Sequence, residues 1–214
     1  MTSNWFKDIV QHIENKPILT ENSIDTDAFM SCFYELYPKI YTIVALDNFI
    51  TEQLKRDILL SFEKIGKFYE KNPTVNKTFD DIIKNEIVKK NNYLWACEND
   101  QNSPCVGILW CYRAFSAFHT FIENLSWNEK SSKDCAKETY KTILKPYHKW
   151  STILIASTVI QFIPDRDVIF ERTGIASTSE GFKTLETFLN TFHPIIERMR
   201  EIIDRHNINF ESVV

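Results

Sequence analysis

Apolar residues recur every three or four positions along most of the chain, which is the spacing of amphipathic helices. In residues 23–50 the apolar face is made of Phe29, Phe33, Leu36 and Ile40. Asp25 and Asp27 precede that face and are candidate N-terminal caps. In residues 51–71 the face is made of Leu54, Ile58, Phe62, Ile65 and Phe68. Residues 78–91 predict a third, short and highly charged helix.

The second half of the chain continues the helical pattern. Residues 105–127 are apolar almost all round, which predicts a central buried helix. Residues 133–163 predict a long helix interrupted by Pro146, and residues 181–206 predict a final helix with a bend at Pro194. Strand-like alternation is nowhere sustained. The sequence therefore predicts an all-α protein with a single domain over residues 1–214.

Composition excludes several function classes. The chain has 214 residues, only 4 glycines and no glycine-rich phosphate-binding motif, which disfavours nucleotide-binding folds. The net charge of −4 gives no support for nucleic-acid binding. The 16 phenylalanines supply large apolar side chains, which form a core or the wall of a cavity for an apolar ligand.

Cysteine usage and hydropathy predict a cytoplasmic address. The five cysteines have neither a CxxC spacing nor a disulfide framework, so we expect reduced thiols and no metal or cofactor. We also expect no signal peptide and no segment long enough to span a bilayer. The expected protein is a monomer that meets membranes only transiently.

Polar side chains at helical spacing form a candidate site. Asp57, Ser61 and Lys64 lie on one face of their predicted helix, and Trp110 neighbours Arg113 on the next. His148 stands at the start of an uncharged apolar run. Other interpretations stay open, because Asp57 and Lys64 suit a solvated face and a buried Arg113 suits a salt bridge. A lone histidine is also commonly a hydrogen-bonded, half-buried residue.

Three segments carrying these residues resemble the glycolipid transfer protein family. They are "RDILLSFEKI", "ILWCYRAFSAF" and "YHKWSTILIASTVIQFIPDR", in the family's order. The resemblance runs from about Phe29 to Arg166. It implies a two-layer helical sandwich that encloses an apolar pocket for lipid chains. It also implies transfer of a sphingolipid between membranes, without catalysis.

The resemblance implies a role for each polar residue. Asp57 and His148 would hydrogen-bond the amide of a ceramide, Lys64 would bind headgroup hydroxyls, and Trp110 would stack on the first sugar. Arg113 would support this site. Burying an amide group without a hydrogen-bond partner would cost roughly 1–3 kcal/mol of binding free energy. A carboxylate and an imidazole would therefore suit its N–H and its carbonyl.

One position departs from the family pattern. Ser61 stands where the family usually has asparagine, and a single hydroxyl makes fewer hydrogen bonds to a sugar than an amide does. A branch of the family carries ceramide-1-phosphate and has a cation in place of the stacking tryptophan. Trp110 favours a glycosylated lipid, whereas Lys64, Arg113 and Arg56 keep a phosphate-bearing lipid open as the alternative.

The apolar pocket and the membrane contact complete the expected site. The residues expected to line the pocket are Phe62, Phe115, Phe118, Phe121 and Phe162. The residues expected to dock on a membrane are Tyr140, Lys145, Lys149 and Trp150. Lysines recur every fourth position from Lys133 to Lys149, which fits either an anionic membrane surface or an ordinary solvated face.

Two further function classes remain open at this point. Ser61 activated by His148 would be a minimal hydrolytic pair, although the sequence has no motif around it. A lipid sensor or adaptor would use the same pocket as a carrier, so sequence does not separate the two.

Overall fold

A computed structural model describes residues 4–44, 49–127, 129–175 and 178–211 of the protein, and for residues 35, 37–44, 49–55 and 57 it describes the backbone only. The described residues form helices and no strand, apart from two isolated β-bridges. The longer helices are α1 (Trp5–Asn15), α2 (Thr26–Val44), α3 (Phe49–Tyr69), α4 (Phe79–Lys89), α6 (Pro104–Trp127), α8 (Trp150–Gln161) and α10 (Ser179–His206). The shorter ones are α5 (Leu94–Glu98), α7 (Ser132–Thr139) and α9 (Arg166–Arg172). The predicted all-α class is confirmed.

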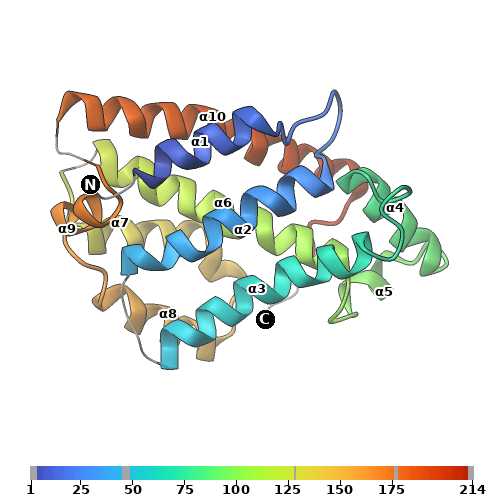
Figure 1. Ribbon diagram of the computed structural model, residues 1–214. Helices are drawn as coiled ribbons and strands as arrows, with labels where there is room; N and C mark the ends of the chain where they lie inside the picture. The colour runs from blue at the N-terminus through green and yellow to red at the C-terminus, as the bar shows by residue number, and fades with distance from the viewer. Residues whose placement is uncertain (1–3, 45–48, 128, 176–177, 212–214) are drawn as a thin grey trace.

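The helices are arranged in two layers (Figure 1). Helices α1, α2 and α3 lie side by side in one layer. Helices α10, α6 and α7 form the other layer, and α8 packs against α7. The layers meet mainly where α3 packs on α6 and α1 packs on α10. Helices α4 and α5 close one end of the sandwich. Helix α1 was not predicted, although Trp5, Phe6, Ile9 and Val10 give it a strongly apolar face.

Helix α6 is the central helix, as its sequence predicts. It packs against α3, α4, α7 and α10, and more than half of its most apolar 18-residue window is buried. By length and composition α6 would suffice to cross a membrane, so the expectation that no segment reaches that length is wrong. Its burial among other helices makes it a core helix of the fold.

The predicted apolar faces of α2 and α3 form the core. Phe29, Phe33 and Leu36 are buried, as are Phe62 and Ile65, while the side chains of Ile40 and Leu54 are outside the described residues. The Asp25 carboxylate accepts a hydrogen bond from the Ala28 N–H at 2.8 Å, which confirms one of the two predicted caps. Phe29 and Phe62 stack within one layer, and both meet Phe115 of the other layer at tilted angles.

The chain between α7 and α8 departs from a regular helix. A π-helical turn covers Tyr140–Leu144 and a single 3-10 turn covers Lys145–Tyr147. Pro146 lies in the 3-10 turn, where its missing N–H and fixed φ end the helix, as predicted. The break turns the chain before α8, and it means that the lysines from Lys133 to Lys149 do not share one helix.

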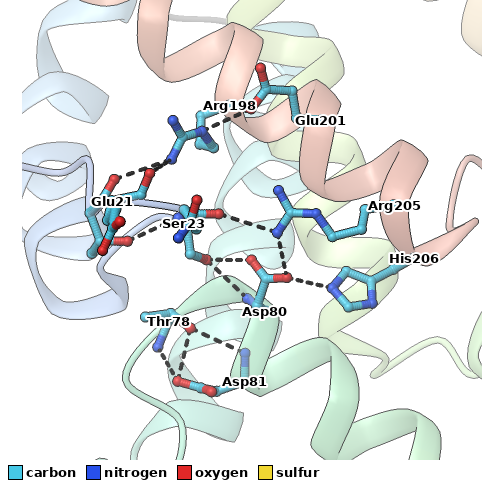
Figure 2. Close-up of polar contacts among 11 residues, drawn as sticks. Glu21, Ser23, Thr78, Asp80, Asp81, Arg198, Glu201, Arg205 and His206 are labelled. Carbon is cyan, nitrogen blue, oxygen red and sulfur yellow. Dashed lines mark hydrogen bonds and ion pairs between the residues drawn. The ribbon is translucent and has the colours of Figure 1, made fainter.

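A buried carboxylate ties the N-terminal loop to the last helix (Figure 2). Asp80 at the start of α4 accepts hydrogen bonds from the Ser23 hydroxyl at 2.6 Å, from Arg205 at 3.0 Å and from His206 at 2.6 Å. Burial raises the pKa of Asp80, but the hydrogen bonds from Ser23 and His206 and the charge of Arg205 outweigh it and lower that pKa overall. Arg198 adds two hydrogen bonds to backbone carbonyls of the same loop.

Helices α3 and α6 lie in close contact at Gly107. A β-carbon built at this position would lie 2.6 Å from the backbone carbonyl oxygen of Ser61 and 3.2 Å from side-chain atoms of Lys64 and Ile65. No side chain fits in that space without moving the α3 backbone. The absence of a side chain at Gly107 therefore sets the distance between the two helices.

We expect Gly107→Ala to destabilise the fold by roughly 1–3 kcal/mol, because the new methyl group meets backbone rather than a flexible side chain. Gly66→Ala is the matched control, since a β-carbon there meets only the end of the Met30 side chain at 3.2 Å. Urea unfolding of both variants measures the difference. Equal stability of the two variants would show that the helices have room at Gly107.

Candidate functional site

A cleft between α3, α6 and the start of α8 gathers most of the predicted polar residues. Its volume is about 450 Å³. We call it the headgroup cleft, and its lining includes Ser61, Lys64, Trp110 and His148 together with the apolar side chains of Ile58, Phe62, Ala114 and Leu144. Residues from three separate sequence segments therefore meet at one place. Polar groups and an apolar wall stand side by side there, as the resemblance implies.

The side chain of Asp57 lies outside the described residues. Its backbone belongs to α3, one turn before Ser61, so the predicted order of the two residues along the helix is retained. Ser61 is buried and Lys64 is half-buried. Because Gly107 brings α6 against Ser61 and Lys64, these side chains reach the wall that carries Trp110.

Arg113 lies behind the headgroup cleft. Its side chain is buried, and its guanidinium lies 5.0 Å from the ring centre of Trp110 and 3.5 Å from that of Tyr147. It donates a hydrogen bond to the backbone carbonyl of Phe210 at 2.6 Å. Burial lowers the pKa of Arg113 to about 10, so it remains charged at neutral pH. The cation is held between two rings, and its supporting role stays a prediction.

His148 is placed by two aromatic side chains. Its ring stacks on Trp110 with centroids 5.4 Å apart, and its Nδ1 lies 3.1 Å from the Tyr140 hydroxyl. Burial, with the charge of Arg113, lowers the pKa of His148 to about 4, so the imidazole is neutral near pH 7. If the Tyr140 hydroxyl donates to Nδ1, the Nε2–H is left as a donor.

A second cleft adjoins the headgroup cleft. Its volume is about 660 Å³, and it shares Lys64, Val106 and Trp110 with the first. We call it the outer cleft, and its polar lining comprises Glu63, Lys67, Lys71, Glu98, Asp100, Gln101 and Asn102. Carboxylates, amides and amines are mixed along it, which suits uncharged hydroxyl groups better than a single anion.

Comparison with known proteins shows to which family the chain belongs. The profile of the glycolipid transfer protein (GLTP) family matches residues 24–174, a range that contains every polar residue of the headgroup cleft. The chain belongs to the glycolipid transfer protein family. Glycolipid transfer protein 2 of Arabidopsis thaliana is 24% identical over 204 residues, covering 92% of this chain and 81% of its own. Glycolipid transfer protein A of Xenopus laevis is 22% identical over 212 residues, covering 95% and 97%.

Solved structures with the GLTP fold agree closely in architecture. One of them is the GLTP-fold structure of FAPP2, a protein that selects simple glycosphingolipids with this fold. Its TM-score is 0.80 at 17% sequence identity, and the match covers 99% of this chain and 100% of the FAPP2 chain. Human ceramide-1-phosphate transfer protein in complex with 12:0 ceramide-1-phosphate has a TM-score of 0.82 at 13% identity, covering 95% and 97%. The predicted fold is thereby confirmed. The two proteins handle lipids with different headgroups, so the structural likeness does not show which headgroup this chain binds.

GLTP-family proteins transfer lipids and are not enzymes, in agreement with the sequence-based expectation. Ser61 therefore has no role as a nucleophile. It lines a binding cleft whose neutral imidazole and lysine can hydrogen-bond a ligand.

The predicted pocket residues fall into different surroundings. Phe62 and Phe115 are fully packed in the core, and Phe62 also borders the headgroup cleft. Phe118 packs toward Trp5 and Phe188, on the side of α6 that faces α1 and α10. Phe121 is partly buried against the core. Phe162 is 52% exposed at the end of α8, so its assignment to an internal pocket is not retained.

Where the described phenylalanines of the two layers meet, little space is left between them. The space bounded by Phe29, Phe33, Phe115 and Phe192 has a volume of only about 10 Å³, no more than one water molecule needs. These rings therefore pack as a core. Lipid chains would have to part them in order to enter between the layers there.

The predicted membrane-docking residues also differ in their surroundings. Lys145, Lys149 and Trp150 are exposed, Trp150 by 79%. Tyr140 is partly buried against the core and contacts His148, so we assign it to positioning that histidine rather than to docking. Tyr147, which covers Arg113, was missed by sequence reasoning. Its place next to His148 in the chain was the only signal.

His148 should make stability depend on pH. The pKa of His148 is lower in the folded protein than the unfolded value of about 6.5. Its contribution to the free energy of unfolding is therefore complete above pH 6.5 and is lost as the pH falls toward 4. We expect the melting temperature of wild type to fall more between about pH 7.5 and pH 4.5 than that of His148→Gln.

Parallel curves for wild type and His148→Gln would mean that the imidazole titrates normally and faces solvent.

Proposed function

We propose that this protein transfers sphingolipids with an uncharged sugar headgroup between membranes. The ceramide amide would lie between Asp57 and His148, the first sugar against Trp110, and the hydrocarbon chains between the two helix layers. Family membership and the fold support sphingolipid transfer. The choice of headgroup rests on the residues of the two clefts.

The scarcity of cations in the headgroup cleft is the observation that carries the choice. Among the described residues that line it, Lys64 is the only lysine or arginine. His148 is neutral, and Arg113 is turned away toward Tyr147 and the Phe210 carbonyl. Arg56 is exposed and does not line the cleft. A phosphate monoester would be poorly neutralised there, whereas sugar hydroxyls need hydrogen bonds and an aromatic face.

The outer cleft supports the same choice. Its three lysines, Lys64, Lys67 and Lys71, are matched by three carboxylates, Glu63, Glu98 and Asp100, so the cleft offers no excess of positive charge to a phosphate. The amides of Gln101 and Asn102 both donate and accept hydrogen bonds, as sugar hydroxyls do. They lie where an extended headgroup would leave Trp110, and they offset the loss of the family asparagine at Ser61.

The amide contact follows from the state of His148. With Tyr140 donating to Nδ1, the neutral imidazole presents Nε2–H to the amide carbonyl of the lipid. The amide N–H would then be accepted by the carboxylate of Asp57. The N–H and the carbonyl of the lipid amide would each have a hydrogen-bond partner on the protein, so neither would be buried without one.

Helix α8 is proposed as the membrane contact. It carries no charged residue and seven of its twelve residues are apolar, yet only Val159 and Ile160 are buried. Trp150 and Leu154 are one turn apart and are 79% and 61% exposed. Lys145 and Lys149 flank the exposed indole, where each contributes about 1 kcal/mol at an anionic surface. The exposed Phe162 extends this apolar surface.

Transfer between vesicles tests the proposal. We expect galactosylceramide to move faster than ceramide-1-phosphate, and we expect Trp110→Ala and His148→Leu to slow it at least tenfold. Trp127→Ala, an exposed tryptophan at the end of the same helix, should leave the rate unchanged. Faster transfer of ceramide-1-phosphate would contradict the headgroup assignment. Binding without transfer would instead indicate a sensor.

Vesicle binding tests the membrane contact separately. We expect Trp150→Ala to weaken binding to phosphatidylserine-containing vesicles by roughly tenfold, because a large indole surface then stays in water. Trp95→Ala on α5, where the indole is 65% exposed, is the matched control. Equal losses in the two variants would refute a docking face on α8.

A further inference from the structure

Three buried ligand-type side chains meet at the end of the sandwich, away from the headgroup cleft. Glu86 of α4, Cys97 of α5 and Cys105 of α6 each offer one ligand atom, and these atoms lie within 4.8 Å of one another. Their side chains are 2%, 0% and 0% exposed. Sequence spacing gave no sign of this group, because the fold joins three helices to form it.

The carboxylate of Glu86 has hydrogen-bond partners but, among the described residues, no cation in ion-pair contact. It accepts hydrogen bonds from the Ser103 hydroxyl at 2.9 Å and from the Cys105 backbone N–H at 3.1 Å. Among the ion pairs of the described residues none includes Glu86, and the neighbouring Lys90 pairs with Asp100 at 2.5 Å. Lys90 acts on Glu86 through its charge but is hydrogen-bonded to Asp100, so a positive charge in direct contact with the buried Glu86 would stabilise this end of the fold further.

We propose that Glu86, Cys97 and Cys105 bind a zinc ion. Thiolates and a carboxylate are established zinc ligands, with Zn–S distances of about 2.3 Å and Zn–O distances of about 2.0–2.2 Å. A tetrahedral ion with such bonds separates its ligand atoms by about 3.5–3.8 Å, so shifts of about 1 Å close the site. The two thiols release their protons to solvent on binding. The fully buried Ser103 hydroxyl is a further oxygen beside Glu86 and is the candidate fourth ligand.

The ion would brace one wall of the outer cleft. Cys97 and Cys105 bound the segment that contains Glu98, Asp100, Gln101 and Asn102, all of which line that cleft. Holding both ends of this segment to α4 fixes its conformation. The metal site does not depend on which lipid the protein carries, so either proposal can fail without the other.

Cobalt(II) titration of the reduced, chelator-treated full-length protein tests the site. We expect thiolate-to-cobalt charge-transfer bands and the visible bands of tetrahedral cobalt, saturating near one equivalent and abolished by zinc. The same zinc addition should raise the melting temperature of wild type. Absence of these bands in a protein whose circular dichroism is that of the folded state would overturn the proposal.

Matched variants identify the ligands. Cys97→Ser should lose the charge-transfer intensity of one thiolate and bind cobalt at least tenfold more weakly. Cys135→Ser, a buried cysteine of α7, should leave the spectrum unchanged. Glu86→Gln keeps an acceptor for Ser103 and Cys105 but removes the charge, so it should fold and bind cobalt at least tenfold more weakly. An unaltered spectrum in Cys97→Ser or Glu86→Gln would overturn the assignment.

Discussion

The close contact between α3 and α6 at Gly107 is the constraint on which the site depends. The Ser61 carbonyl occupies the space that any side chain at position 107 would fill. This contact brings the polar face of α3 within reach of Trp110, one turn further along α6. A wider separation of the two helices would leave the same residues in place along the chain but would no longer close them around one cleft.

Behind the cleft, charge is arranged so that the binding surface itself is nearly neutral. The guanidinium of Arg113 is enclosed by Trp110, Tyr147 and the Phe210 carbonyl. Burial lowers the pKa of His148 and the charge of Arg113 lowers it further, which keeps this imidazole unprotonated near neutral pH. A neutral imidazole can accept from Tyr140 and donate to a ligand at the same time. An imidazolium would be donor only.

Much of the fold could be predicted from the sequence, because long apolar periodicities are local signals. The faces of α2, α3, α6 and α10 were evident from spacing, and Pro146 marked the break before α8. Short helices such as α5 and α9 have too few turns for an apolar spacing to repeat along the sequence, and they were missed. The partial burial of Tyr140 and the exposure of Phe162 could not be predicted, because exposure is decided by packing between distant segments. The clustering of Glu86 with two cysteines is likewise a tertiary property.

The π-helical and 3-10 turns before α8 have a mechanical consequence. They connect Tyr140, Tyr147, His148 and Trp150 within one short, irregular segment. His148, the proposed contact of the lipid amide, and Trp150, the proposed membrane contact, are thus separated by a single lysine. A small rotation of α8 on reaching a membrane would tilt the imidazole as well. Arrival at the target surface and loosening of the cargo would then be one motion, with no separate trigger for unloading.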